Sequence, residues 1–316
     1  GEFDEGTLNA LRASPDMKSI EEDNTVEPEA PVAELGSPWG LSRISQDVRV
    51  QVQGSACSLA YTYRYDTSAG TGVDIYIFGI NTTHVDFGGR ARLGPAFGSP
   101  ENIDDSGHGT HVAGIAAGTR CGVAKSANLI AVKVLWVPPG VSISISALDY
   151  VAASATASGR PTVINMSLST AISPALDSAT TAITGRGIHV AAAAGNQTTD
   201  ASNRSPARVP SVNTVAASNI SDARYVLSNY GPLVDLFAPG EQIPSAWIGS
   251  NTAERCTSGT SMASPHIAGL IAYFIGRGED TLSAAAMSAL LKQYTIKDAI
   301  DPSTLRTCQI QLHLPL

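Results

Sequence analysis

Charged residues are scarce in this chain. Asp, Glu, Lys and Arg make up 15% of its 316 residues, against about 25% in ordinary soluble proteins. Hydrophobic residues make up 43%, so the composition excludes a mostly disordered chain, which requires low hydrophobicity and high charge. The net charge is −8, and we expect no nucleic-acid partner because phosphate binding needs a basic face.

Long apolar runs and closely paired cysteines are missing too. No run approaches the ~18 residues that a membrane-spanning helix needs, so we expect no membrane partner. The four cysteines, Cys57, Cys121, Cys256 and Cys308, include no CxxC pair, which argues against a zinc site. They allow three complete disulfide pairings, and buried free thiols are an equal alternative.

The chain does contain a regular alternation of strand and helix patterns. Residues 4–36 are acidic and contain proline, whereas residues 37–316 are rich in small and apolar residues. The alternation predicts βαβ units and a mostly parallel sheet, with the active cleft beyond the carboxyl ends of the strands. The predicted strands are Val73–Phe78, Leu129–Leu135, Val163–Leu168, Ile188–Ala193, Val212–Ala217 and Leu233–Ala238. The predicted helices lie within Gly107–Gly118, Ser146–Ser158, Pro174–Gly185 and Ser264–Arg277.

Two short segments within this framework carry chemistry. The segment SGHGTHVAG (residues 106–114) places His108 at the start of a predicted helix, where its imidazole can serve as a general base. The segment GTSMASPH (residues 259–266) places Ser261 between small residues ahead of another helix, where a nucleophilic hydroxyl finds room and amide donors. Taken singly, a packed core histidine and a helix-capping serine are ordinary alternatives.

Together the two segments resemble the His and Ser blocks of the subtilisin-like serine proteases (peptidase family S8), and above all the proteinase K-like group. The block AAGN (residues 193–196) is similar as well. The resemblance implies a three-layer α/β sandwich with a central, mostly parallel sheet, in which Ser261 is the nucleophile, His108 the general base and Asn196 the oxyanion donor. It also implies the following substrate-binding residues: Ser167, Leu168, Ser169, Ala193, Ala194 and Gly195.

The N-terminal residues have a counterpart in the same family. Residues 15–26 resemble the last strand of the inhibitory propeptide, while the opening Gly-Glu-Phe is typical of a cloning remnant. We therefore divide the chain into residues 1–36, which hold that remnant, a propeptide fragment and a linker, and residues 37–316, the subtilisin-like domain. The propeptide segment is then an expected intramolecular partner of the cleft.

One position breaks the family pattern. The register of the surrounding block places Ile77 where the family has the Asp of the catalytic triad, and Ile cannot accept a hydrogen bond from the histidine. Asp74 lies three residues earlier and therefore points to the opposite face of a strand. Asp104 aligns with a different family Asp, which leaves Asp105 or a rearranged loop as a replacement acid.

Two further departures affect the expected cleft. Ser169 and Thr170 stand where the family usually has two glycines, so their side chains narrow the place where the substrate backbone would lie. The segment from Trp136 to Ser142 contains two prolines in place of a polar, glycine-rich edge. Prolines lack amide donors, which weakens the recognition of an extended peptide.

The resemblance also implies a metal site. Proteinase K-like proteins bind calcium through two backbone carbonyls and one Asp, and Pro210, Val212 and Asp235 fall on those positions. Oxygen ligands suit Ca²⁺, so we expect a structural calcium and no cofactor for catalysis.

Three functions remain open at this point. The first is a subtilisin-like serine hydrolase with an incomplete triad and weak or no general proteolysis. The second is a non-catalytic pseudoprotease that binds a peptide or protein, and the third is a repurposed enzyme that acts on a small non-peptide molecule in the old cleft. In each case the resemblance implies a secreted monomer.

Overall fold

The computed structural model describes residues 4–14, 31–98, 101–134, 140–297, 299–300 and 310–312. The chain divides into two compact units, residues 1–30 and residues 31–316. In the first unit, helix α1 (Glu5–Arg12) is capped by Asp4, whose carboxylate accepts a hydrogen bond from the backbone N–H of Thr7. The propeptide-like residues 15–26 lie outside the described residues.

The second unit begins before the predicted boundary at residue 37. Strand β1 (Val32–Ser37) pairs antiparallel with β2 (Tyr61–Tyr65). Glu34 of β1 also accepts a hydrogen bond from Lys125 at 3.1 Å. The last residues of the predicted linker are therefore part of the domain, which starts at Pro31.

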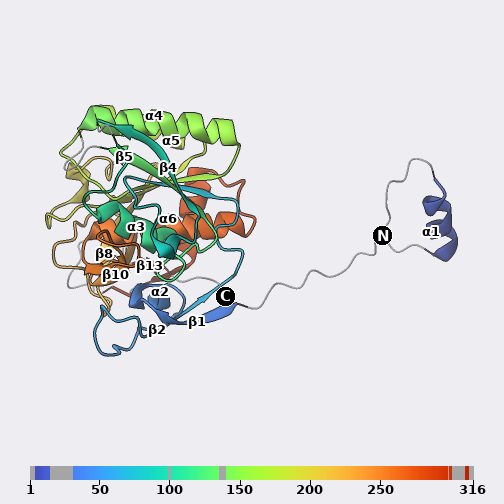
Figure 1. Cartoon of the computed structure of the whole chain (residues 1–316), viewed down its shortest axis with the longest axis horizontal. Helices are drawn as coiled ribbons and strands as arrows, with labels where there is room; N and C mark the ends of the chain where they lie inside the picture. The colour runs from blue at the N-terminus through green and yellow to red at the C-terminus, as the bar shows by residue number, and fades with distance from the viewer. Residues whose placement is uncertain are drawn as a thin grey trace. The chain divides into compact units, whose positions relative to one another are not determined.

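A nine-stranded sheet forms the centre of the domain (Figure 1). Its strand order is β12-β13-β9-β8-β7-β6-β3-β5-β4, and every neighbouring pair is parallel except β12 and β13. The strands are β3 (Asp74–Ile77), β4 (Ala91–Phe97), β5 (Asn128–Val134), β6 (Thr162–Met166), β7 (His189–Ala193), β8 (Asn213–Ser218), β9 (Leu236–Pro239), β12 (Thr295–Lys297) and β13 (Ile310–Leu312). A separate hairpin consists of β10 (Ile243–Ala246) and β11 (Glu254–Thr257).

Helices cover both faces of this sheet, which confirms the predicted three-layer sandwich. Helices α4 (Val141–Ser158) and α5 (Pro174–Thr184) pack on one face with Tyr76 of β3. Helices α3 (His108–Ala117) and α6 (Thr260–Gly276) pack on the other, and Figure 1 shows α4 and α5 at the top of the view with α3 and α6 below. The remaining helices are α2 (Trp39–Arg43), α7 (Ala284–Gln293) and the short 3-10 turns Val85–Phe87 and Ala201–Asn203. No described helix is long and apolar enough to cross a membrane.

Helix α6 lies in the middle of the core because nearly all of its side chains are apolar or small. A helix that is hydrophobic all round is stable only when it is surrounded by protein. Residues on every side of α6 are buried, from Met262 to Ile275. The nucleophile candidate thus stands on a helix that is buried on all sides.

One disulfide joins distant parts of the chain. Cys57 and Cys256 are bonded with a Cα–Cα distance of 5.7 Å, across 199 residues of sequence. Cys121 is a buried free thiol, and Cys308 lies outside the described residues. The structure therefore selects a pairing that the sequence left open.

Candidate active site

Ser261 stands in the first turn of α6, next to the carboxyl end of β6. Its hydroxyl donates to the backbone carbonyl of Ser167 at 3.3 Å, and the Ser167 hydroxyl donates to the backbone carbonyl of Ser261 at 2.7 Å. The second bond is possible because Pro265 has no N–H with which to occupy the Ser261 carbonyl in the helical pattern. These two bonds hold the nucleophile against a segment predicted to bind substrate.

His108 is the first residue of α3. It follows Gly107, whose φ of 81° is left-handed and whose missing Cβ leaves room for the ring of Trp247. Burial lowers the pKa of His108, and the nearby charge of Asp104 raises it in part. The imidazole is therefore neutral at pH 7 and able to take up a proton.

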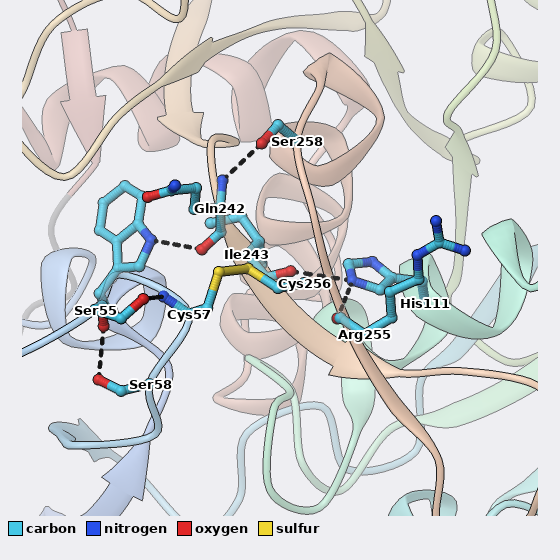
Figure 2. Close-up of a disulfide and its surroundings, with 10 residues drawn as sticks. Ser55, Cys57, Ser58, His111, Gln242, Ile243, Arg255, Cys256 and Ser258 are labelled. Atoms are coloured by element: carbon cyan, nitrogen blue, oxygen red, sulfur yellow. Dashed lines mark hydrogen bonds between the residues drawn. A yellow bond between two sulfur atoms is a disulfide. The ribbon is translucent and has the colours of Figure 1, made fainter.

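The next histidine along α3 fixes this helix to the hairpin. His111 contacts the backbone carbonyls of Ile243 at 3.1 Å and Arg255 at 3.0 Å through Nε2, which must carry the proton because carbonyls only accept. Figure 2 shows Arg255 beside Cys256, so the disulfide, the hairpin and the His111 ring form one connected region.

Ile77 is the last residue of β3, and the two residues that follow it contact the first turn of α3. A Cβ on Gly109 would collide with the carbonyl oxygens of Phe78 and Gly79, so the backbones of the two elements touch there. Ile77 is 1% exposed and belongs to the same apolar cluster as Val112 of α3. An apolar side chain therefore occupies the strand end that lies against the histidine's helix.

Asp74 lies away from the histidine's helix. It lies at the opposite end of β3, and its carboxylate pairs with Arg92 at 2.8 Å and Arg160 at 2.7 Å and accepts from Asn128 at 3.0 Å. Tyr76, which shares its side of the strand, packs with the α4 layer, whereas Ile77 packs with the α3 layer. This arrangement agrees with the face predicted from strand alternation.

The two carboxylates nearer to the histidine are committed elsewhere. Asp104 accepts hydrogen bonds from the backbone N–H groups of Ser106, Gly107 and Thr110 and from the Thr110 hydroxyl, at 2.6–3.1 Å. Asp105 pairs with Lys133 at 2.6 Å, and this bond holds the pKa of Asp105 below its usual value. Among the described residues, no hydrogen bond joins the His108 imidazole to a carboxylate or to Ser261. Neither Asp105 nor another described carboxylate is thus hydrogen-bonded to the His108 ring.

Asn196, the predicted oxyanion donor, is held next to the first turn of α6. It follows β7, and its Oδ1 accepts from the N–H of Thr260 at 2.9 Å and from the Thr260 hydroxyl at 3.1 Å. Both bonds use the oxygen, which leaves Nδ2 free to donate. The same Thr260 hydroxyl accepts from the N–H of Gly195 at 3.1 Å. A donor is therefore oriented beside Ser261 by the residue that precedes it.

The predicted substrate-binding residues come together at the ends of two neighbouring strands. Ser167, Leu168 and Ser169 follow β6, and Ala193, Ala194 and Gly195 end and follow β7, its parallel partner. The segments differ in exposure, since the first is half-buried and the second buried. Of the predicted edge, residues 135–139 lie outside the described residues, and Gly140 precedes α4.

One side chain near these segments was missed by the sequence analysis. The guanidinium of Arg204 donates to the Ser169 hydroxyl at 3.3 Å and to the Ser169 carbonyl at 3.5 Å. Arg204 precedes Ser205, which pairs with Thr170 in an antiparallel bridge. In the sequence, Arg204 is one of two arginines, with Arg208, in a region with few charges.

The residues predicted to hold calcium do not fit the ion as they stand. Both oxygens of Asp235 are engaged: Oδ1 lies 2.6 Å from the ammonium of Lys292, and Oδ2 accepts from the N–H of Thr214 at 2.9 Å. An ammonium beside the carboxylate supplies the positive charge that a cation would bring. Calcium at Pro210, Val212 and Asp235 would have to displace it.

Comparisons with known proteins agree with this geometry. A sequence model of the Subtilase family matches residues 70–307. Alkaline protease 1 from Emericella nidulans is 43% identical over 298 residues, which cover 93% of this chain and 72% of that protein. Subtilisin-like protease 2 from Pseudogymnoascus destructans is 42% identical over 306 residues, which cover 94% and 74%.

Solved structures show the same fold. A cold-adapted subtilisin-like serine proteinase superposes with a TM-score of 0.78 at 37% identity, over 89% of this chain and 99% of that one. Sphericase superposes with a TM-score of 0.64 at 28% identity, over 72% and 84%. The α/β sandwich of this chain is thus the fold of these subtilisin-like structures.

Proposed function

Because the chain belongs to the subtilase family, we propose that it is a subtilisin-like serine hydrolase with an incomplete triad, whose general proteolysis is weak or absent. Ser261 is the nucleophile, His108 the base and Asn196 the oxyanion donor. The observation that carries the proposal is Ile77, a buried apolar residue beneath the helix that begins with His108.

The physical consequence follows from what the acid does in this mechanism. It accepts from Nδ1–H of the histidine, fixes the tautomer and stabilises the imidazolium that forms when the serine loses its proton. In subtilisin, removal of this acid alone lowers turnover by ~3 × 10⁴, which corresponds to about 6 kcal/mol. The serine, the histidine and the oxyanion donor are retained here, which supports residual acyl transfer to and from Ser261 more than a role in binding alone.

The decisive experiment restores the acid. Ile77→Asp introduces a carboxylate, and Ile77→Asn is its matched control because it has the same shape without the charge. We measure hydrolysis of an activated ester and of a peptide, and labelling of Ser261 by a fluorophosphonate, with Ser261→Ala as the blank. We expect slow labelling in the native chain, a gain of up to ~10⁴-fold in Ile77→Asp and little change in Ile77→Asn.

Two results would contradict the proposal. Native peptidase activity equal to that of Ile77→Asp would show that the acid is not needed. Absence of any Ser261 labelling in both proteins, with both folded, would favour a pseudoprotease that only binds its ligand.

We also propose that the protein matures in an oxidising compartment of the secretory pathway. The disulfide between Cys57 and Cys256 supports this proposal, because structural disulfides are rare in the reducing cytosol.

A further inference from the structure

Arg204 carries a positive charge that the described structure does not neutralise. Its Nη2 contacts only the neutral oxygens of Ser169, and its Nε is buried with no hydrogen-bond partner. No ion pair among the described residues includes Arg204. Arg208, one turn further along, differs in this respect because it pairs with Asp177 at 3.6 Å.

An unneutralised guanidinium in a half-buried place is unfavourable. Arginine stays protonated at every physiological pH, so it cannot lose the charge, and an unpaired donor removed from water costs free energy. Its planar group matches a carboxylate through two parallel hydrogen bonds. Arg204 is therefore better satisfied when a carboxylate from outside the chain lies against it.

The position of Arg204 relates it to the nucleophile. Ser169 lies two residues after Ser167, whose carbonyl accepts the hydroxyl of Ser261. Two steps of extended chain span about 7 Å, which is within the reach of an acidic side chain attached next to the reacting carbonyl. The bridge between Thr170 and Ser205 holds the Arg204 loop against this segment, beyond the carboxyl end of β6.

The charge of the rest of the protein makes this arginine selective. The net charge is −8, so the surface as a whole repels acidic ligands. An acidic group is attracted where a local positive charge lies unpaired, as it does on Arg204 beside Ser169. A neutral ligand of the same shape would leave the guanidinium uncompensated.

We propose that Arg204 is a specificity-determining residue, and that the acyl substrate of this cleft carries a carboxylate on the side chain next to the reacting carbonyl, as a Glu residue of a peptide does. This inference rests on the proposed function, since it assumes that Ser261 attacks that carbonyl. Arg204 itself takes no part in the bond changes and acts only by holding the substrate's acid.

The test compares two phosphonate probes that react with the serine and differ only in a Glu or a Gln side chain. Rates of Ser261 labelling are measured in the native protein and in the Ile77→Asp background. We expect the Glu probe to react at least tenfold faster, and the ratio to fall towards one in Arg204→Gln. Arg204→Glu should favour a Lys probe, and Arg208→Gln is the matched control that keeps the native preference.

The controls separate this inference from the proposed function. If Ser261 labels with neither probe, calorimetric binding of an acetylated Glu peptide amide against its Gln analogue still measures the preference at Arg204. Arg204→Lys, which keeps the charge, covers the case in which Arg204→Gln fails to fold, and it should retain part of the preference. The proposal is overturned if Gln binds or reacts as well as Glu, if the Glu preference survives in Arg204→Gln, or if neither peptide binds.

Discussion

Acid should destabilise this protein at pH values above those at which carboxylates titrate, because three histidines are buried in neutral form. Burial lowers the pKa of His111, His189 and His266 from the usual 6.5 to about 4. Nδ1 of His111 and of His189 is buried with no hydrogen-bond partner, and Nε2 of His266, whose Nδ1 contacts the Met262 carbonyl, lies against Gly40. Protonating any of them places a charge in the core.

Proton linkage gives the sign and the size of the change in the free energy of unfolding with pH. Between pH 6.5 and 4 the unfolded chain binds protons at these histidines and the native chain does not, so stability falls as the pH falls. At pH 5 each histidine contributes about 2 kcal/mol of destabilisation relative to neutral pH, or about 6 kcal/mol together. The free energy of unfolding of a domain is typically only about 5–15 kcal/mol, so this loss removes much of the stability of the native state. The lowered pKa of His108 adds in the same direction.

The assay is denaturant unfolding at several pH values between 7 and 4.5, followed by tryptophan fluorescence and circular dichroism. We expect the free energy of unfolding to fall with a slope of about 4 kcal/mol per pH unit near pH 5, the value for three protons. His189→Gln lies outside the candidate site and should reduce the slope to about 3 kcal/mol per pH unit. A stability that stays constant within about 1 kcal/mol from pH 7 to pH 5 would refute the reasoning.

Two further predictions concern the disulfide and the ion pair between Lys292 and Asp235. Replacing Cys57 and Cys256 together by Ser should lower the free energy of unfolding by up to about 5 kcal/mol, because the disulfide closes a loop of 199 residues. Calorimetry on the reduced and the oxidised protein checks this. Equal melting temperatures for the two forms would contradict it. A chelator should leave the melting temperature of the native protein unchanged, because Lys292 already neutralises Asp235, whereas Lys292→Gln should be stabilised by added Ca²⁺. A rise of several degrees on adding Ca²⁺ to the native protein would show that the ion displaces the lysine.

The sequence predicts the sheet and the reactive residues because both have local signals. The strand that ends at Ile77 is rich in β-forming residues, and the alternation of its side chains correctly separates Asp74 from Ile77. His108 and Ser261 lie in short glycine-rich segments whose spacing requires no knowledge of distant residues. The backbone contact at Gly109 then brings the end of β3 to the start of α3.

The features that the sequence did not predict depend on residues far apart in the chain. Cys57 meets Cys256 only after the hairpin has folded against the N-terminal region, so no local pattern identifies the pair. Lys292 meets Asp235 across 57 residues, which changes a predicted metal ligand into half of an ion pair. The unpaired charge of Arg204 becomes visible only once Ser169 and the neighbouring loop are in place.

The late position of α6 in the sequence has a consequence for synthesis on the ribosome. This helix follows seven strands of the sheet in chain order, yet it fills the space between α3 and one face of that sheet. Until residue 276 has emerged, that face remains exposed on the nascent chain, and exposed apolar surface favours aggregation. Folding of the whole domain on the ribosome therefore depends on the helix that positions Ser261. A nascent chain that stalls before this helix would need a chaperone to cover its exposed apolar face.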